Sequence, residues 1–171
     1  MTASSNSGVS GGGSGGSGGS GSGSSGSGSS SGVKTDSGSL PSYVVRGTWT
    51  QAEDGTWKFT DSAGNPYTNT WAAVENPYAD EAAGQQKFDW FRFDENGKMI
   101  TGWYYDSGDR YWYYLNPVSD GTLGRMMTGW VIIDGYYHYF NPNSDGSRGR
   151  LYMNEMTPDG YQVGGDGKWI K

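Results

Sequence analysis

The stretch that decides the fold runs from Gly102 to Trp130 and reads GWYYDSGDRYWYYLNPVSDGTLGRMMTGW. It begins and ends with Gly-Trp, and between them lie a turn-rich segment at 106–109, an aromatic run at 111–115 and a second turn at Asn116-Pro117. Aromatic rings fit a pleated, half-buried surface, and clusters of Asp, Asn, Ser and Gly are typical of turns. The pattern therefore predicts a β-hairpin that leads into another copy of itself at Trp130.

The same pattern recurs along the chain. The tryptophans that open its copies are Trp49, Trp71, Trp103 and Trp130, at spacings of 22, 32 and 27 residues. The spacings differ in the connections, as expected for a hairpin repeat with variable loops. The longest copy holds an insertion around 75–84, in which residues 79–83 are long enough for one helical turn. The end of the chain, 157–169, predicts a shorter terminal hairpin, because end repeats cap a stack and are atypical.

The N-terminal quarter has a composition that cannot pack. Every residue from Gly11 to Gly32 is Gly or Ser, and no aromatic residue occurs before Tyr43. Such a segment has nothing to bury against the entropy of ordering it. We therefore predict a disordered Gly/Ser-rich linker over residues 1–42 and a folded repeat module over residues 43–171.

The core of that module must be unusual. All 8 Trp, 13 Tyr and 5 Phe residues lie from Tyr43 onward, whereas Leu, Ile and Val together number 16 in the whole chain. A multilayered core needs many aliphatic residues, but a thin stack of repeats can be built from rings and glycines. We predict an all-β fold in which tandem β-hairpins form a β-solenoid of about four hairpins plus a terminal cap.

Charge and composition exclude several classes of partner. The formal net charge of −6 disfavours nucleic acid and anionic lipid, which both require a basic face, and is compatible with a cationic ligand. There is no Cys, and no apolar run approaches the roughly 20 residues of a membrane span. The N-terminus has neither a charged nor an apolar signal-peptide region, so no signal peptide is visible.

Four tandem motifs resemble a known family. MITGW at 99–103, WYYLN at 112–116, MTGW at 127–130 and TPDGY at 157–161 resemble the choline-binding or cell-wall-binding repeat, also called the glucan-binding repeat, of Gram-positive surface proteins. The resemblance covers about residues 47–171, and it is the combination in tandem that is specific. It implies a β-hairpin solenoid that anchors a secreted or cell-surface protein to the cell wall, with choline-bearing teichoic acid or another wall polymer as partner, or alternatively a glucan.

The resemblance also implies where ligands bind. Family sites lie between successive hairpins and use the Trp of Gly-Trp, the Trp of Trp-Tyr-Tyr and an aromatic residue of the next hairpin. Here this gives one site on Trp103 and Trp112, walled by Trp130, Tyr137 or Tyr139. A second site uses Trp71 and Trp90 with Trp103 or Trp112. The chain departs from the pattern where Tyr137 replaces the second Trp, where Arg92 takes the place of Tyr114, and where Lys58 takes the place of Tyr113.

Aromatic faces attract a quaternary ammonium through their quadrupoles. Two or three such faces give a single site of about millimolar affinity, which several sites on one polymer raise by multivalency. The same rings can stack on sugar faces, and the spacing does not separate the two ligands. A third reading is a structural segment of a surface adhesin whose rings only pack.

Catalysis is not indicated. There is no Ser/His/Asp or Cys/His set, and the single histidine, His138, aligns with Tyr113 in a strand. Asp80 and Glu81 are neighbours in a loop, which does not fix the separation that a glycosidase pair requires. The Asp-Gly turns lack the acidic ladder of a calcium loop. We therefore predict a non-catalytic binding module without cofactor or metal.

Overall fold

The structure, a computed structural model, describes residues 39–171. The predicted linker lies outside the described residues except for 39–42, so its disorder stays a prediction. Residues 40–171 form one compact unit. No helix among the described residues has the length and apolar character needed to cross a bilayer.

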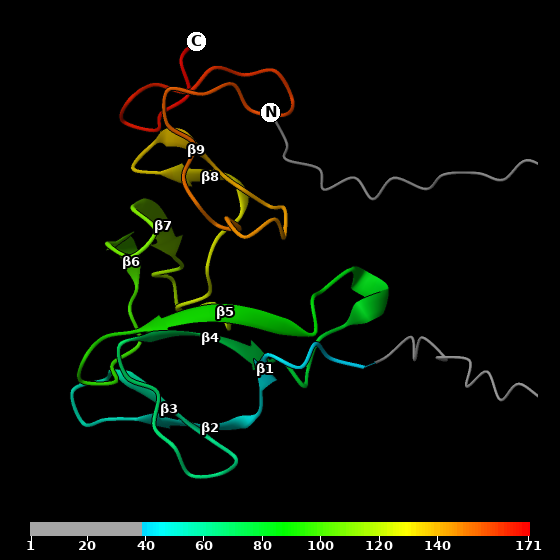
Figure 1. Cartoon of the computed structure of the whole chain (residues 1–171), viewed down its shortest axis with the longest axis vertical. Helices are drawn as coiled ribbons and strands as arrows, with labels where there is room; N and C mark the ends of the chain where they lie inside the picture. The colour runs from blue at the N-terminus through cyan, green and yellow to red at the C-terminus, as the bar shows by residue number, and fades with distance from the viewer. Residues whose placement is uncertain (1–38) are drawn as a thin grey trace, which may run out of the picture. The chain divides into compact units, whose positions relative to one another are not determined.

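Four antiparallel hairpins make up this unit and follow one another in chain order (Figure 1). They are β2 (Gly47–Gln51) with β3 (Trp57–Asp61), β4 (Thr70–Glu75) with β5 (Phe88–Phe93), β6 (Gly102–Asp106) with β7 (Tyr111–Leu115), and β8 (Gly129–Ile133) with β9 (Tyr136–Phe140). A two-residue strand, β1 (Val44–Val45), pairs in parallel with β4. The predicted all-β class and the tandem hairpins are confirmed.

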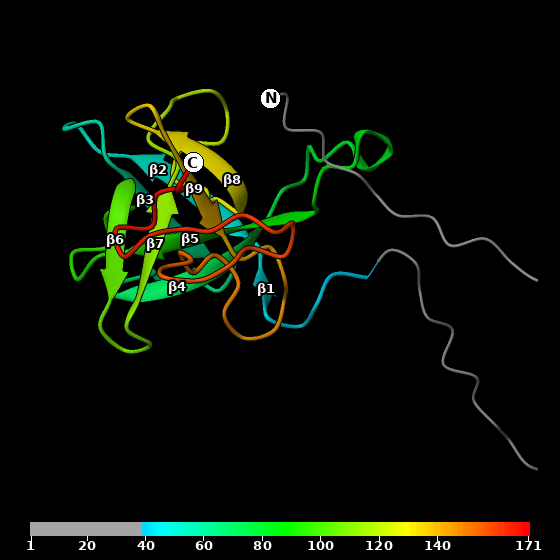
Figure 2. The same ribbon diagram turned by 90° about the horizontal axis from the view of Figure 1, so that it is seen from above.

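The insertion lies between β4 and β5. It contains the short 3-10 helix η1 (Glu81–Ala83), which the side chain of Asp80 caps at its start and Gly84, in the left-handed conformation, ends. In both views it projects from the ends of β4 and β5 beyond the hairpins (Figures 1 and 2). The helical turn expected there is therefore present, and it leaves the hairpin pairing intact.

Successive repeats are joined by one backbone hydrogen bond that recurs at four levels. At three levels, the segment that follows one hairpin donates a backbone N–H to a carbonyl in the second strand of the preceding hairpin. At the fourth level, the terminal segment donates to the second strand of the last hairpin. The pairs are Met99 to Trp57 (2.8 Å), Met126 to Trp90 (2.8 Å), Leu151 to Trp112 (2.7 Å) and Trp169 to Tyr137 (2.9 Å). Each return segment thus joins one hairpin to the hairpin before it.

The core is divided into small clusters along the stack. Each is built on residues that are almost fully buried, notably Phe59, Phe93, Leu115 and Phe140. Rings and aliphatic side chains share these clusters, for example Phe140 with Ile133 and Leu151 in the last one. Stability in such a stack comes mainly from contacts between neighbouring repeats.

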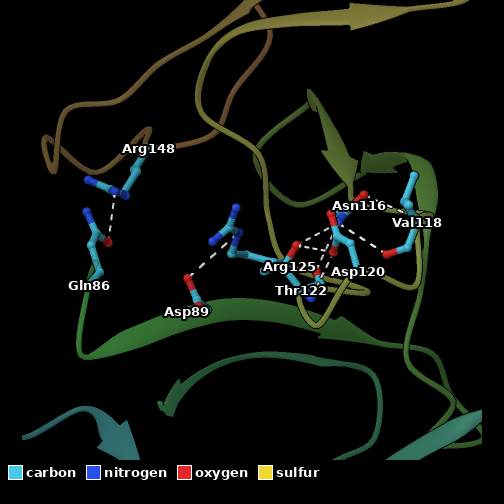
Figure 3. Close-up of polar contacts among 8 residues, drawn as sticks. All are labelled: Gln86, Asp89, Asn116, Val118, Asp120, Thr122, Arg125 and Arg148. Carbon is cyan, nitrogen blue, oxygen red and sulfur yellow. Dashed lines mark hydrogen bonds and ion pairs between the residues drawn. The ribbon is translucent and has the colours of Figure 1, made fainter. Parts of the chain in front are cut away.

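Buried asparagines organise the long loops after β7 and β9. The Nδ2 of Asn116 donates to Asp120 Oδ1 (3.1 Å) and Thr122 Oγ1 (2.7 Å), while its Oδ1 accepts from the N–H of Val118 (3.0 Å; Figure 3). Asn141 makes the equivalent bonds in the next loop. The Asn-Pro turns expected from the sequence therefore hold each return segment in place.

The end of the chain is less regular than a hairpin. It forms two successive short loops, each closed by one isolated bridge, Met156 with Gln162 and then Val163 with Trp169, and no strand is formed there. Turns follow one another too closely in this segment for a longer ladder to form. It nevertheless covers the last hairpin through Trp169, so the predicted cap is present in a looser form.

Candidate aromatic binding sites

Strand alternation decides which ring faces which neighbour. In β7, Tyr113 and Leu115 are buried against the preceding hairpin, whereas Trp112, on the other face of the strand, is 39% exposed and contacts Trp103 and Tyr105 of its own hairpin. In β9, His138 and Phe140 likewise face the preceding hairpin, and Tyr137 faces the terminal segment. Because side chains alternate along a strand, each hairpin supplies rings to two different sites.

Trp103 and Trp112 come together as the resemblance implies. Their ring centroids are 6.2 Å apart, their planes are nearly perpendicular (86°), and each residue is 39% exposed. From the next hairpin, His138 lies 5.2 Å from Trp103 and Phe140 lies 5.9 Å from it. The ring that closes on Trp103 is therefore His138.

The three expected walls of that site lie elsewhere. Trp130 contacts both Tyr137 and Tyr139, and none of the three is within ring-contact distance of Trp103 or Trp112 among the described residues. Tyr139 is buried and packs between Trp130 (5.1 Å) and Tyr152 (5.1 Å). Trp130 and Tyr137 belong to the next site along the chain.

That next site is a closed cycle of four rings. The centroid distances around it are Trp130–Tyr137 6.3 Å, Tyr137–Trp169 5.9 Å, Trp169–Tyr161 5.7 Å and Tyr161–Trp130 5.7 Å. Each ring plane stands at 81–90° to the next, as the walls of a box do. Sequence reasoning missed Tyr161 and Trp169, because the terminal segment is predicted as a cap, although it carries the aromatic motif TPDGY.

A carboxylate lies beside this cycle. The indole Nε1–H of Trp130 donates to Asp159 Oδ2 (2.8 Å), and Thr157 Oγ1 donates to Asp159 Oδ1 (2.6 Å). Partial burial alone would raise the pKa of Asp159, but the hydrogen bonds from Thr157 and Trp130 outweigh it and hold the pKa below its usual value. Asp159 therefore stays charged at neutral pH and also orients the Trp130 ring.

The expected site on Trp71 and Trp90 has a different arrangement. Trp71 contacts Tyr113 (4.9 Å) and Tyr104 (5.8 Å) of the next hairpin, whereas Trp90 stacks on Tyr43 (5.8 Å, 22°). Neither ring is within contact distance of Trp103 or Trp112 in the part of the chain that the structure describes.

Arg92 adds a cation to this position. It lies opposite Trp71 in the β4–β5 register, is buried, and donates to Tyr104 Oη (2.9 Å) with its guanidinium 5.1 Å from the Tyr104 ring. An internal cation thus already contacts one of the rings beside Trp71. This arrangement disfavours a second, external cation at the same position.

One wall position recurs at all four levels. A ring from the following repeat contacts the first Trp of each hairpin. The pairs are Phe91 with Trp49 (4.9 Å), Tyr113 with Trp71 (4.9 Å), His138 with Trp103 (5.2 Å) and Tyr161 with Trp130 (5.7 Å). At the first level Trp49 also packs on Phe59 and Phe93 and is part of the core. The two cages with accessible rings are therefore the Trp103–Trp112 cage and the terminal four-ring cage.

Metal binding finds no support in the described residues, where no group of three or more His, Cys, Asp and Glu side chains is placed to hold an ion.

Comparison with known proteins gives matches among solved structures only. No family model matches the sequence, and no curated protein matches it. Choline-binding protein F from Streptococcus pneumoniae, solved with a peptidoglycan analogue, is 31% identical with a TM-score of 0.41, over 73% of this chain and 40% of that protein. CbpJ from the same organism is 29% identical with a TM-score of 0.40, over 72% and 41%.

A third similar structure is the pneumococcal cell wall endolysin from phage Cp-1 complexed with choline, at 23% identity and a TM-score of 0.43, over 73% of this chain and 37% of that one. The chain thus spans about two fifths of the length of these proteins. Structures similar to this chain are choline-binding proteins, as the repeat motifs predict.

Proposed function

We propose that residues 43–171 form a non-catalytic cell-wall-targeting module that binds choline-like cations in aromatic cages between repeats. Its partner would be choline-bearing teichoic acid or another wall polymer, and its location the outer surface of the cell. The observation that carries the proposal is the closed cycle of Trp130, Tyr137, Tyr161 and Trp169.

The dimensions of this cycle suit a trimethylammonium group. Given the four distances between neighbouring ring centroids, the point midway among the centroids lies on average no more than about 4.2 Å from each of them. This is inside the roughly 6 Å over which a cation is attracted to a ring face. Perpendicular walls surround a compact cation on several sides. A cation there would also be attracted by the Asp159 carboxylate, which the Trp130 indole holds nearby.

The Trp103–Trp112 cage adds a second, more open site. Its two Trp residues are well exposed, and His138 supplies the third ring. Each cage alone is weak, but two sites on one polymer act together because the second binding event is intramolecular. The net charge of −6 supports binding of a cationic polymer substituent.

One observation favours a glycan as the second candidate. Tyr105 and Trp112 are neighbours at 5.2 Å, both are exposed, and Tyr111 beside them is exposed as well. A sugar stacks on an open ring face, and this patch offers several. The four-walled terminal cage offers no such platform, so the two ligands predict different residues.

Equilibrium dialysis against choline and against dextran separates these functions. Tyr161→Leu keeps apolar volume but removes one wall of the terminal cage, so the number of bound cholines should fall by one. Tyr78→Leu, at a 90% exposed position on the insertion, is the matched control and should bind as the parent does. Binding of dextran without choline would refute the cation proposal. Binding of neither ligand would favour the structural role.

A further inference from the structure

His138 occupies the recurring wall position that holds Tyr113 and Tyr161 in the neighbouring levels of the stack. Its ring is 5.2 Å from Trp103 at 73°, and the residue is 3% exposed. It is the only histidine in the chain. Tyrosine and phenylalanine cannot become cations, whereas imidazole takes up a proton in mildly acidic solution. The Trp103–Trp112 cage is therefore the one cage of the described stack whose wall can acquire positive charge.

The hydrogen bonding of His138 shows where that proton would go. Its Nδ1 lies 3.1 Å from the backbone carbonyl oxygen of Tyr136, which can only accept a hydrogen bond. Nδ1 therefore carries the hydrogen in the neutral ring, and Nε2 is the atom that gains the second proton. Protonation leaves the bond to Tyr136 in place, so the ring changes charge without a need to turn.

We propose that His138 makes cation binding by the Trp103–Trp112 cage pH-dependent, with the cage binding while the imidazole is neutral and losing affinity when Nε2 is protonated. The inference rests on the proposed function of the cages. It separates the two accessible cages, because Tyr161 at the same position of the terminal cage keeps its charge constant over the same range.

Three charged groups face His138, one cation and two carboxylates. Lys168 and Asp166 of the terminal segment face it, the former through the His138–Lys168 bridge, and Asp134 faces it from the turn between β8 and β9. The contact from β6 is the uncharged ring of Trp103. Burial lowers the pKa of His138 most, the bond to the Tyr136 carbonyl raises it, and the net pKa lies below the usual 6.5. The imidazole is neutral at pH 7.5 and becomes charged in acid.

Coulomb repulsion sets the size of the effect. Two unit charges about 6 Å apart in a partly exposed site, with an effective dielectric constant of about 40, weaken binding about tenfold. The coupling is reciprocal, so a bound cation lowers the pKa of His138 by the same factor. Saturation with choline should therefore shift the His138 titration by about one pH unit.

The single histidine allows this shift to be measured directly. The imidazole C2 proton of the full chain is followed by NMR from pH 4.5 to 8, with saturating choline chloride or with sodium chloride at equal ionic strength. We expect choline to lower the midpoint by about one unit. The same shift should persist in Tyr161→Leu, which impairs only the terminal cage, and should vanish in Trp112→Ala.

A second variant tests the same inference by binding. His138→Tyr installs the residue of the neighbouring levels, so the acid-dependent loss of one choline site between pH 7.5 and 5 should disappear. An unchanged midpoint in a sample whose Trp fluorescence reports choline binding would overturn the inference alone. A histidine that does not titrate above pH 4.5 would overturn it too. Absence of any choline binding at pH 7.5 would overturn the proposed function and this inference with it.

Discussion

Replacement of Gly149 by Ala should destabilise the stack much more than the same change three residues earlier. Gly149 has φ +84°, and a methyl group there would overlap Met126 Sδ and lie 2.7 Å from Met126 Cε. Met126 is 9% exposed and packs with Tyr113 and Leu115, so it has little room to move. Gly146 in the same loop has φ +91° with nothing within 4 Å, which makes it the matched control.

The expected magnitudes follow from these two environments. An L-residue in the left-handed conformation costs about 1–2 kcal/mol, and this applies to both positions. Overlap with a buried side chain adds about 1–3 kcal/mol at Gly149 only. We therefore expect losses of about 2–5 kcal/mol for Gly149→Ala and about 1–2 kcal/mol for Gly146→Ala in the free energy of unfolding.

Urea unfolding followed by near-ultraviolet circular dichroism measures both losses. In a Met126→Ala background the overlapping atoms are gone, so Gly149→Ala should there cost no more than Gly146→Ala, and the cycle should give a coupling of about 1–3 kcal/mol. Equal losses for the two glycines in the parent, or no coupling to Met126, would refute the packing of each return segment on the one before it.

Three further changes test other contacts. Trp112→Leu keeps apolar volume but removes the ring face, so choline should quench Trp fluorescence almost as poorly as in Trp112→Ala; parent-like quenching in the Leu variant would assign Trp112 to packing. Asn116→Ala removes the amide that Asp120, Thr122 and Val118 share, and should cost about 2–3 kcal/mol by urea unfolding; a loss below about 0.5 kcal/mol would show that the loop holds itself. Glu155→Gln weakens the pair with Arg150 (2.7 and 2.9 Å), which holds the pKa of Glu155 below its usual 4.5. The pair therefore adds about 0.5–1 kcal/mol to the free energy of unfolding at neutral pH, and this contribution is lost as the pH falls from 4.5 through the folded pKa. Between pH 6 and 3, acid unfolding should therefore show a smaller loss of unfolding free energy in the Gln variant than in the parent.

The hairpins could be predicted because each motif contains the residues of both strands and of the turn between them within a short stretch of sequence. Gly-Trp opens β6, the run 111–115 forms β7, and the same cycle recurs in β8 and β9. The return segments were not predictable. Their bonds to the preceding hairpin join backbone groups of irregular segments, such as Met126 N–H to Trp90 C=O, and leave no periodic side-chain pattern.

The sequence predicts two rings of the first cage, Trp103 and Trp112, and the third ring lies one residue away from the predicted Tyr137 and Tyr139. Trp103 and Trp112 meet because they lie on paired strands of one hairpin, which the sequence shows. The ring from the next hairpin is His138, while its neighbours Tyr137 and Tyr139 point the other way. Sequence alone does not say which face of β9 meets the preceding repeat, and a shift of one residue in a strand reverses the face.

The backbone of the stack explains why its cages can differ so much from level to level. The bond between repeats uses the carbonyl of Trp57, Trp90, Trp112 or Tyr137, and it is indifferent to the side chain that the return segment carries. The donors of that bond are Met99, Met126, Leu151 and Trp169, so the same position holds an aliphatic chain at three levels and a fourth aromatic wall only at the last. The recurring wall position varies in the same way, from Phe91 to Tyr161. Because the bond itself does not involve side chains, the rings beside it differ from level to level: Trp49 joins the core, an internal cation lies beside Trp71, and open aromatic cages form at Trp103 and Trp130.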